Sequence, residues 1–217
     1  TPLYSSAASD VYKRQEVRIL NLYSGLGGNR SAWGYYEVTA VESNPKIAAV
    51  YQDRFPQDNV VVGDAHEYLL KNFNDYDFIW SSPPCQTHSS FRHNLCVRFR
   101  GTEAVYPDMK LYQEILLLQH NSKALFIVEN VTPYYKPLIS PNGKAGRHLI
   151  WSNFIDGEID ISKKPKLRNA QIPELQKYHN IDLSKYDLKG LNKRQLLRNC
   201  VDAEIGGKIL RKIYDRN

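Results

Sequence analysis

The chain of 217 residues is poor in cysteine, with only three, at positions 85, 96 and 200. An odd number of cysteines at such irregular spacings supports neither a disulfide framework nor a metal site. The sequence also lacks any apolar run close to the roughly 18 residues that a membrane-spanning helix needs. We therefore expect a cytoplasmic protein that binds neither a metal nor a membrane.

The first fifteen residues lack the charged and apolar regions of a signal peptide. They resemble translated adaptor or vector sequence, so we expect residues 1–15 to be a non-native or disordered leader. The true start would then lie upstream or near Glu16. The length suits one well-formed core and is too short for two ordinary domains.

Net charge is absent from the first 156 residues, where 15 Lys and Arg balance 15 Asp and Glu. Residues 157–217 hold 14 basic against 8 acidic residues and so carry the whole net charge of +6. Such asymmetry is the footprint expected for contact with phosphates, although a charge run is by default a solvated face. The densest basic cluster is Lys163, Lys164, Lys166 and Arg168.

Strand-like and helix-like segments alternate along the chain. Apolar, β-branched runs predict strands at 17–22, 37–41, 59–62, 77–80 and 124–128, and helices are predicted at 45–55, 65–72 and 108–119. This alternation predicts an α/β fold with a doubly wound, mostly parallel sheet. In such a sheet, ligands bind and chemistry occurs at the carboxyl ends of the strands.

The first predicted strand ends in a glycine-rich turn, Tyr23-Ser24-Gly25-Leu26-Gly27-Gly28. The sequence lacks the G-x-G-x-x-G pattern of dinucleotide sites, so the turn alone is a weak sign of a cofactor site. The second strand ends in Glu42, which could accept both hydroxyls of a ribose. Asp64 follows the third strand, and taken alone it is more readily explained as a helix N-cap.

One cysteine follows the fourth predicted strand directly, in Ser81-Ser82-Pro83-Pro84-Cys85-Gln86. Two prolines end the strand and turn the chain outward, which presents Cys85 at the edge of the sheet. A buried structural cysteine is an equally good explanation of Cys85 alone. Glu129, at the end of the fifth strand, is either a solvated strand terminus or a catalytic group.

Taken in order, these motifs resemble those of the DNA cytosine-5 methyltransferases, and the resemblance extends from about Val17 to Leu210. The glycine turn resembles the first motif of that family, Pro83–Gln86 its nucleophile motif and Glu129-Asn130-Val131 its E-N-V motif. The segment from Arg198 to Gly206 resembles the closing motif. The resemblance implies a Rossmann-like class I methyltransferase fold with S-adenosyl-L-methionine as cofactor. The implied cofactor-binding residues are Tyr23, Ser24, Gly25, Gly27, Gly28, Glu42, Asp64, Pro84 and Asn199.

The resemblance also implies a reaction, in which a methyl group is transferred to carbon 5 of cytosine in double-stranded DNA. The Cys85 thiolate would add to carbon 6 of a base flipped out of the duplex, and Glu129 would hold ring nitrogen 3 and the exocyclic amine. The long segment 87–106 shows no core face, so we expect a mobile loop that closes over the base, or a solvated surface loop.

The arginine-containing motif of the family, Q-x-R-x-R, is not recognisable. Residues 146–153 resemble its counterpart, and either Arg147 or His148 could approach the cytosine carbonyl; we take Arg147 as the catalytic candidate beside Cys85 and Glu129. Asn21 stands where the family usually has an acidic residue.

We expect a catalytic domain at 16–156, a short basic target-recognition segment at 157–193 and a helical return at 194–217. So short a recognition segment predicts short or relaxed specificity. The resemblance is to small methyltransferases of the kind expected in phages and bacteria, and we expect a monomer.

Three alternatives stay open. An RNA cytosine-5 methyltransferase would use the same catalytic residues. A catalytically inactive nucleic-acid-binding relative would have no need for both Cys85 and Glu129. A nicotinamide-dependent oxidoreductase would use the glycine turn and Glu42, but it gives no use for Pro-Pro-Cys-Gln.

Overall fold

The computed structural model describes residues 17–162 and 169–214. The expected leader at 1–15 and the basic cluster from Lys163 to Arg168 lie outside the described residues.

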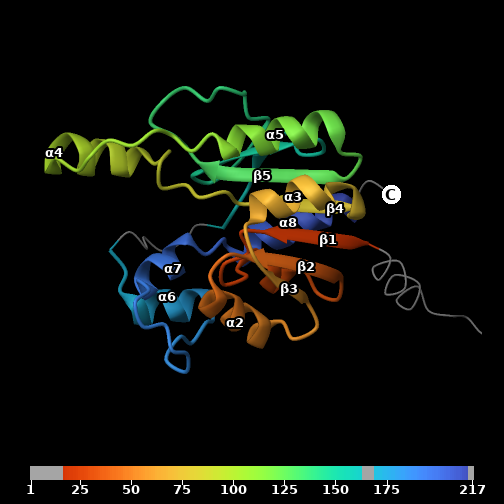
Figure 1. The fold of residues 1–217 in the computed structure, drawn as a ribbon, viewed down its shortest axis with the longest axis horizontal. Coiled ribbons are helices and arrows are strands. Elements are labelled where there is room, and N and C mark those ends of the chain that lie inside the picture. The colour runs from red at the N-terminus through yellow and green to blue at the C-terminus, as the bar shows by residue number, and fades with distance from the viewer. Residues whose placement is uncertain (1–16, 163–168, 215–217) are drawn as a thin grey trace, which may run out of the picture.

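In the described part of the chain, eight strands form one sheet (Figure 1). They are β1 (Arg18–Leu22), β2 (Glu37–Glu42), β3 (Asn59–Val62), β4 (Phe78–Ser81), β5 (Leu125–Val131), β6 (Gly143–Ala145), β7 (His148–Ser152) and β8 (Gly157–Ile159). Their order is β3-β2-β1-β4-β5-β7-β6-β8. The first five strands in this order are parallel, and β7 is antiparallel to both β5 and β6. The prediction of a mostly parallel, Rossmann-like sheet is confirmed.

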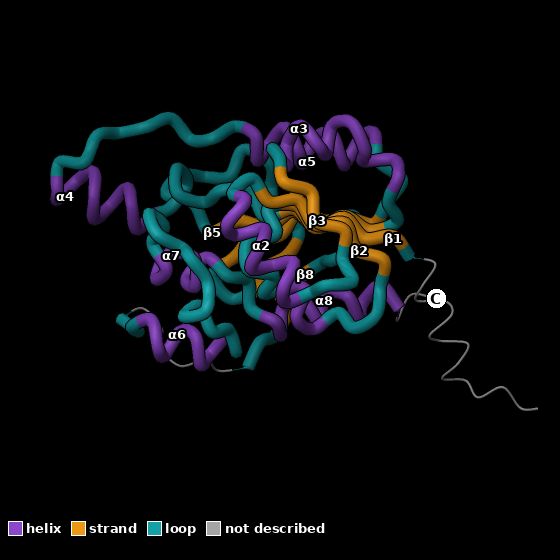
Figure 2. Tube along the Cα trace, turned by 60° about the horizontal axis from the view of Figure 1, so that its bottom comes forward, coloured by secondary structure: helices purple, strands orange, loops and turns teal. Residues whose placement is uncertain are grey.

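Helices cover both faces of this sheet. They are η1 (Asn29–Ala32), α2 (Pro45–Arg54), α3 (Ala65–Asn72), η2 (Phe73–Asp75), η3 (Arg92–Val97), α4 (Arg98–Arg100), α5 (Lys110–Asn121), α6 (Ile172–His179), α7 (Lys193–Asn199) and α8 (Ala203–Tyr214). Figures 1 and 2 show α3 and α5 together on one side of the sheet, with α8 on the other.

Alternation along the strands explains the two layers. In β1, Leu20 and Leu22 pack with the apolar residues of α3 and α5, whereas Ile19 packs with those of α8. Successive side chains of a strand point to opposite faces, so a strand buried on both faces is apolar throughout. The core therefore lies on both sides of the sheet and fixes the carboxyl ends of the strands at one edge.

Strand order reverses at β1. The chain runs from β1 outward through β2 to β3, and then returns so that β4 pairs with the other side of β1. Ligands bind at such switch points, outside the carboxyl ends of the strands. The glycine turn after β1 and the Pro-Pro-Cys loop after β4 leave the sheet there, next to each other.

The expectation of a loop at 87–106 is wrong for its central part. Residues 90–100 are helical, with the π-helix η3 followed by α4, and the helix ends at Gly101 with φ +65°. This segment projects away from the sheet at the upper left of Figure 1. Most of its described side chains face solvent. Its sequence therefore carries no apolar stripe that would predict a helix.

Two findings refine the expected recognition segment at 157–193. Residues 157–159 form the edge strand β8 and so belong to the sheet. Beyond them, Leu175 and Leu183 do not form a core of their own, and neither does Leu197 of the expected helical return. They pack in one cluster with Leu26 and the α2 residues Ile47 and Val50, and this fixes α6 and α7 beside the glycine turn.

Candidate active site

The glycine turn after β1 is a tight backbone structure. Tyr23, Gly25 and Gly27 have φ values of +54°, +52° and +71°. A Cβ on Gly27 would lie 2.4 Å from the Phe55 ring, and one on Gly28 would lie 1.9 Å from the Val201 carbonyl oxygen. Close packing on both sides therefore requires glycine at these two positions.

Glu42 holds this turn against the end of β2. Its Oε2 accepts a hydrogen bond from the Gly25 N–H at 3.1 Å, and its Oε1 accepts one from the Asn44 N–H at 2.8 Å. A carboxylate offers about four acceptor positions, so these bonds leave capacity for a ligand hydroxyl.

Behind the turn, a buried polar network supports β1. Asn29 Nδ2 donates to Asn21 Oδ1 at 2.8 Å, so Asn21 serves as a neutral acceptor where the family usually has an acid. The Arg30 guanidinium and the Asp58 carboxylate form a buried pair with two bonds of 2.8 Å each. Both charges are thus compensated inside the fold.

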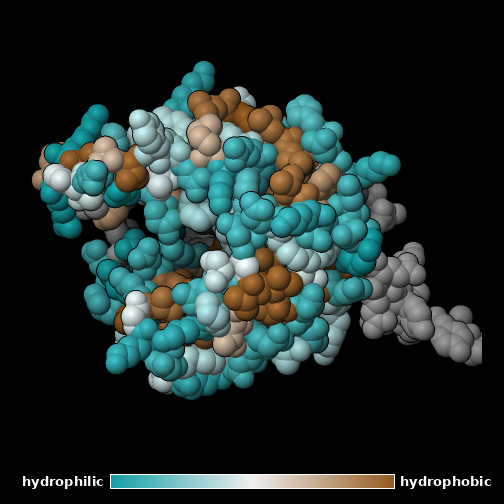
Figure 3. Space-filling view, viewed as in Figure 1, coloured by the Kyte–Doolittle hydropathy of each residue, from teal (hydrophilic) through white to brown (hydrophobic). Residues whose placement is uncertain are grey.

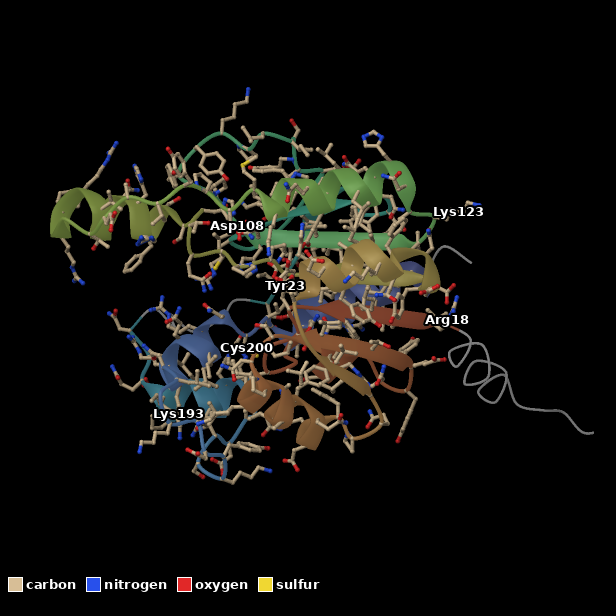
Figure 4. The ribbon with its side chains drawn as sticks, in the orientation of Figure 1. Arg18, Tyr23, Asp108, Lys123, Lys193 and Cys200 are labelled. Atoms are coloured by element: carbon tan, nitrogen blue, oxygen red, sulfur yellow. The ribbon has the colours of Figure 1, made fainter. Side chains whose placement is uncertain are left out.

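A cavity of about 280 Å³ opens where the turn, the ends of β4 and β5, the start of β7 and the end of α7 meet. Seven of the predicted cofactor contacts line it: Tyr23, Ser24, Gly25, Gly28, Glu42, Pro84 and Asn199. The predicted catalytic residues Cys85, Glu129 and Arg147 line it as well. Figure 4 shows Tyr23 at the end of β1 and Cys200, another lining residue, near the end of α7.

Two predicted cofactor contacts do not line this cavity. Gly27 packs against the rings of Tyr51 and Phe55. Asp64 caps α3 by accepting from the His66 and Glu67 N–H groups at 2.8 and 3.1 Å, and it forms an ion pair of 3.1 Å with Lys110. The N-cap interpretation of Asp64 is therefore confirmed, and its carboxylate is already engaged.

The cavity suits a polar ligand such as S-adenosyl-L-methionine. Ser24 is 7% exposed, and its hydroxyl has no hydrogen-bond partner among the residues that the structure describes. Buried hydroxyls are normally satisfied, so Ser24 is poised to bond a group that enters the cavity. Glu42 adds a carboxylate for ribose hydroxyls, and the glycines keep the wall free of side chains.

The Cys85 loop is held from two sides. Asn130, buried at the end of β5, donates from Nδ2 to the Pro83 carbonyl at 2.9 Å. On the other side, the His88 and Ser89 N–H groups donate to the Cys85 carbonyl at 3.1 and 3.0 Å. The half-buried thiol is thereby fixed at the cavity wall.

Burial and the neighbouring charges shift the pKa of the Cys85 thiol in opposite directions. Burial raises the pKa of the thiol above its ordinary value of 9.0, and the Glu129 carboxylate raises the pKa further, while Arg147 lowers it. The thiol therefore stays largely protonated near neutral pH, and Arg147 is the charge that favours the thiolate.

Glu129 is 8% exposed and lies beside His148, whose Nδ1 is 3.3 Å from Glu129 Oε2. Arg147 is exposed, and its Nη2 donates to the Arg198 carbonyl at 3.3 Å. The two candidates from the β7 region thus have different neighbours: His148 pairs with the carboxylate, and Arg147 acts on the cysteine.

Glu114 was not found from the sequence, although it is fully buried beneath the site. It accepts hydrogen bonds from the Tyr23 hydroxyl at 2.5 Å and the Ser81 hydroxyl at 2.6 Å, and it contacts His66 Nδ1 at 2.9 Å. One sequence signal could have indicated Glu114: it is a carboxylate on the apolar face of a predicted helix, among Leu111, Ile115 and Leu118.

Among the residues described, no group of three or more His, Cys, Asp or Glu side chains is placed to hold a metal ion. None of the helices in the described ranges has the length and apolarity to cross a membrane.

Comparison with known proteins found a matching family and a similar curated protein. The family described as C-5 cytosine-specific DNA methylase matches residues 17–144. A tRNA (cytosine(38)-C(5))-methyltransferase from Spodoptera frugiperda is 36% identical over 77 residues, which cover 32% of this chain and 23% of that protein. The chain thus aligns with about a quarter of the length of that relative.

Solved structures match over similar parts of the chain. A mutant of DNMT2 from Spodoptera frugiperda is 27% identical and covers 54% of this chain and 36% of its own, with a TM-score of 0.37. A putative DNA modification methyltransferase encoded within a prophage of E. coli is 22% identical and covers 56% of this chain and 34% of its own, with a TM-score of 0.36.

Proposed function

The chain belongs to the C-5 cytosine-specific DNA methylase family, and we propose that it methylates carbon 5 of cytosine in double-stranded DNA through a covalent Cys85 adduct. The observation that carries this proposal is that Cys85, Glu129 and the glycine turn line one cavity. A nicotinamide-dependent oxidoreductase would give no use to the cysteine and the second carboxylate at that place.

The methyl donor of this family is S-adenosyl-L-methionine, which supplies an electrophilic methyl group when bound. Tyr23, Ser24, Gly25, Gly28, Glu42, Pro84 and Asn199 are the residues proposed to hold it. Glu42 would accept from the ribose, and the Ser24 hydroxyl would bond a polar group of the donor.

Cys85 supplies the nucleophile. Its thiolate forms a bond to carbon 6 of cytosine, and this addition makes carbon 5 electron-rich enough to accept a methyl group. Glu129 holds ring nitrogen 3 and the exocyclic amine, so that negative charge developing on the ring meets a proton or hydrogen bond. Transfer of the carbon-5 proton to solvent then expels the Cys85 sulfur as a thiolate and restores the aromatic ring.

His148 is suited to hold the Glu129 carboxylate in place, because its Nδ1 lies within 3.3 Å of that carboxylate. Arg147 is suited to stabilise the Cys85 thiolate, since its charge lowers the pKa of the thiol. A target base must leave the duplex to reach either group.

An RNA target is the second candidate. It is favoured by the relative from Spodoptera frugiperda, whose name gives a tRNA cytosine as the target. The same cysteine and glutamate would serve both substrates, so the distinction depends on contacts outside the catalytic cavity.

Incubation with labelled S-adenosyl-L-methionine and either duplex DNA or transfer RNA would test the proposal. We expect label in DNA, and DNA containing 5-fluorocytosine should trap a covalent adduct that Cys85→Ala does not form. Cys96→Ala removes another thiol that is not among the predicted site residues; it is the matched control and should still form the adduct. Label in transfer RNA alone would show that the substrate is RNA and not DNA. An adduct formed by Cys85→Ala would show that Cys85 is not the nucleophile.

A further inference from the structure

A second cavity adjoins the catalytic cavity. It has a volume of about 340 Å³ and is lined by residues of the Cys85 loop, the start of the projecting segment and α7. Cys85, Gln86, Val131, Arg147 and Asn199 line both cavities, so Cys85 stands at their junction. Figure 3 shows the surface hollowed between the projecting segment at the upper left and the lobe below it.

The charges of the two cavities differ. Four arginines line the second cavity, Arg92, Arg147, Arg194 and Arg198, and no Asp or Glu is among its lining residues. We call it the arginine cavity. The catalytic cavity, by contrast, includes Glu42 and Glu129. A cavity lined by cations without a carboxylate favours a polyanion.

The arginines stand on opposite walls. Arg194 and Arg198 are four residues apart on α7 and so lie on the same face of that helix. Arg194 Nε donates to the Ala170 carbonyl at 2.9 Å, which fixes its orientation. Arg92 lies on the other wall, where its Nη2 donates to the Glu103 carbonyl at 3.2 Å. A guanidinium has five N–H donors in a rigid fork that matches phosphate.

The geometry of a flipped nucleotide points to the same place. When its base reaches Cys85, the phosphates on either side of that nucleotide stay within one backbone step of the cavity mouth. We propose that the arginine cavity binds this stretch of phosphodiester backbone, with Arg194 and Arg198 as its phosphate contacts on α7. The inference rests on the proposed function, because it takes Cys85 as the group that meets the base.

The test is binding of a fluorescent duplex made only of A·T pairs, which contains no target cytosine. The variant Arg194→Gln/Arg198→Gln is compared with Arg211→Gln/Lys212→Gln, which removes the same charge from two exposed residues of α8 that line neither cavity. Affinity is measured by fluorescence anisotropy over a range of salt concentrations. Calorimetric binding of S-adenosyl-L-methionine shows that each variant is folded.

Each phosphate contact contributes about 0.9 to the slope of log affinity against log salt on duplex DNA. The α7 variant should therefore flatten the slope by about 1.8, and the α8 variant should leave it nearly unchanged. An α7 slope equal to that of wild type, or equal flattening in both variants, would overturn the proposal.

If the α7 variant loses S-adenosyl-L-methionine binding, Arg92→Gln tests the opposite wall and should flatten the slope by about 0.9. An unchanged slope there would overturn the proposal as well. Methyl transfer by a variant with the wild-type slope would reject the arginine cavity and leave the proposed function standing. If the wild-type protein binds neither duplex DNA nor RNA, the proposed function itself fails.

Discussion

The Tyr23 hydroxyl donates a hydrogen bond of 2.5 Å to Glu114, a fully buried carboxylate on α5. The same carboxylate accepts from Ser81, at the end of β4, four residues before Cys85. One side chain therefore joins the glycine turn to the strand that carries the catalytic loop. This arrangement explains why a charged group is retained in an apolar layer, since its partners satisfy it.

Replacing Glu114 by glutamine should weaken both connections. The amide keeps the shape of the side chain but loses the charge and one acceptor oxygen, and a lost hydrogen bond to a charged group costs about 1.5–3 kcal/mol. We expect the free energy of unfolding to fall by that amount in denaturant titration and S-adenosyl-L-methionine to bind more weakly. Glu103→Gln, at an exposed position, is the control and should change neither quantity. A stable Glu114→Gln with unchanged affinity would contradict this role.

The contact between His66 and Glu114 predicts a pH dependence of stability. The bond to Glu114 raises the pKa of His66 in the folded state above its ordinary value of 6.5. A group whose pKa is raised by folding stabilises the fold below the unfolded pKa, and that contribution is lost as pH rises through the folded pKa. Wild-type Tm should thus exceed that of His66→Asn most clearly below pH 6.5, and the difference should shrink as pH rises above the folded pKa. A difference independent of pH would contradict this coupling.

Much of the fold was predictable because its signals are local. Apolar runs gave β3 and α3 with correct bounds, and glycines and prolines marked the turns at the carboxyl ends of β1 and β4. In a parallel sheet those ends share one edge, so the lining of the catalytic cavity followed from strand order.

Contacts between distant segments were not predictable. Glu114 lies 91 residues from Tyr23, and a lone carboxylate in a helix gives no sign of its partner. Segment 90–100 was missed for a different reason. Five of its nine described side chains are exposed, so its sequence shows no periodic apolar face. His88 was expected in a loop but is fully buried, where its Nδ1 contacts the Tyr135 hydroxyl.

Reactivity of Cys85 should depend on Arg147. Burial holds the pKa of this thiol above 9.0 and Arg147 opposes that effect, so removing Arg147 raises the pKa further. Because only the thiolate reacts, alkylation of Cys85 by iodoacetamide should increase with pH across the neutral range and be slower in Arg147→Gln than in wild type. Arg147→Lys keeps the charge and should retain most of the rate. Peptide mass spectrometry would measure alkylation at Cys85 separately from the other two cysteines. Equal rates in wild type and Arg147→Gln would show that the charge does not act on the thiol.

Gly28→Ala should move the segment Asn199–Val201 away from the glycine turn. The added Cβ would lie 1.9 Å from the Val201 carbonyl oxygen and 2.5 Å from Cys200 Sγ, so backbone must move. Overpacking of this kind costs about 1–3 kcal/mol, and here it displaces Asn199–Val201 from the cavity wall. We therefore expect both a lower free energy of unfolding and weaker S-adenosyl-L-methionine binding by calorimetry. Gly63→Ala is the matched control, because a Cβ there meets nothing within 4 Å and the residue has no positive φ. If Gly28→Ala and Gly63→Ala bind S-adenosyl-L-methionine with equal affinity, the segment Asn199–Val201 is not part of the cofactor site.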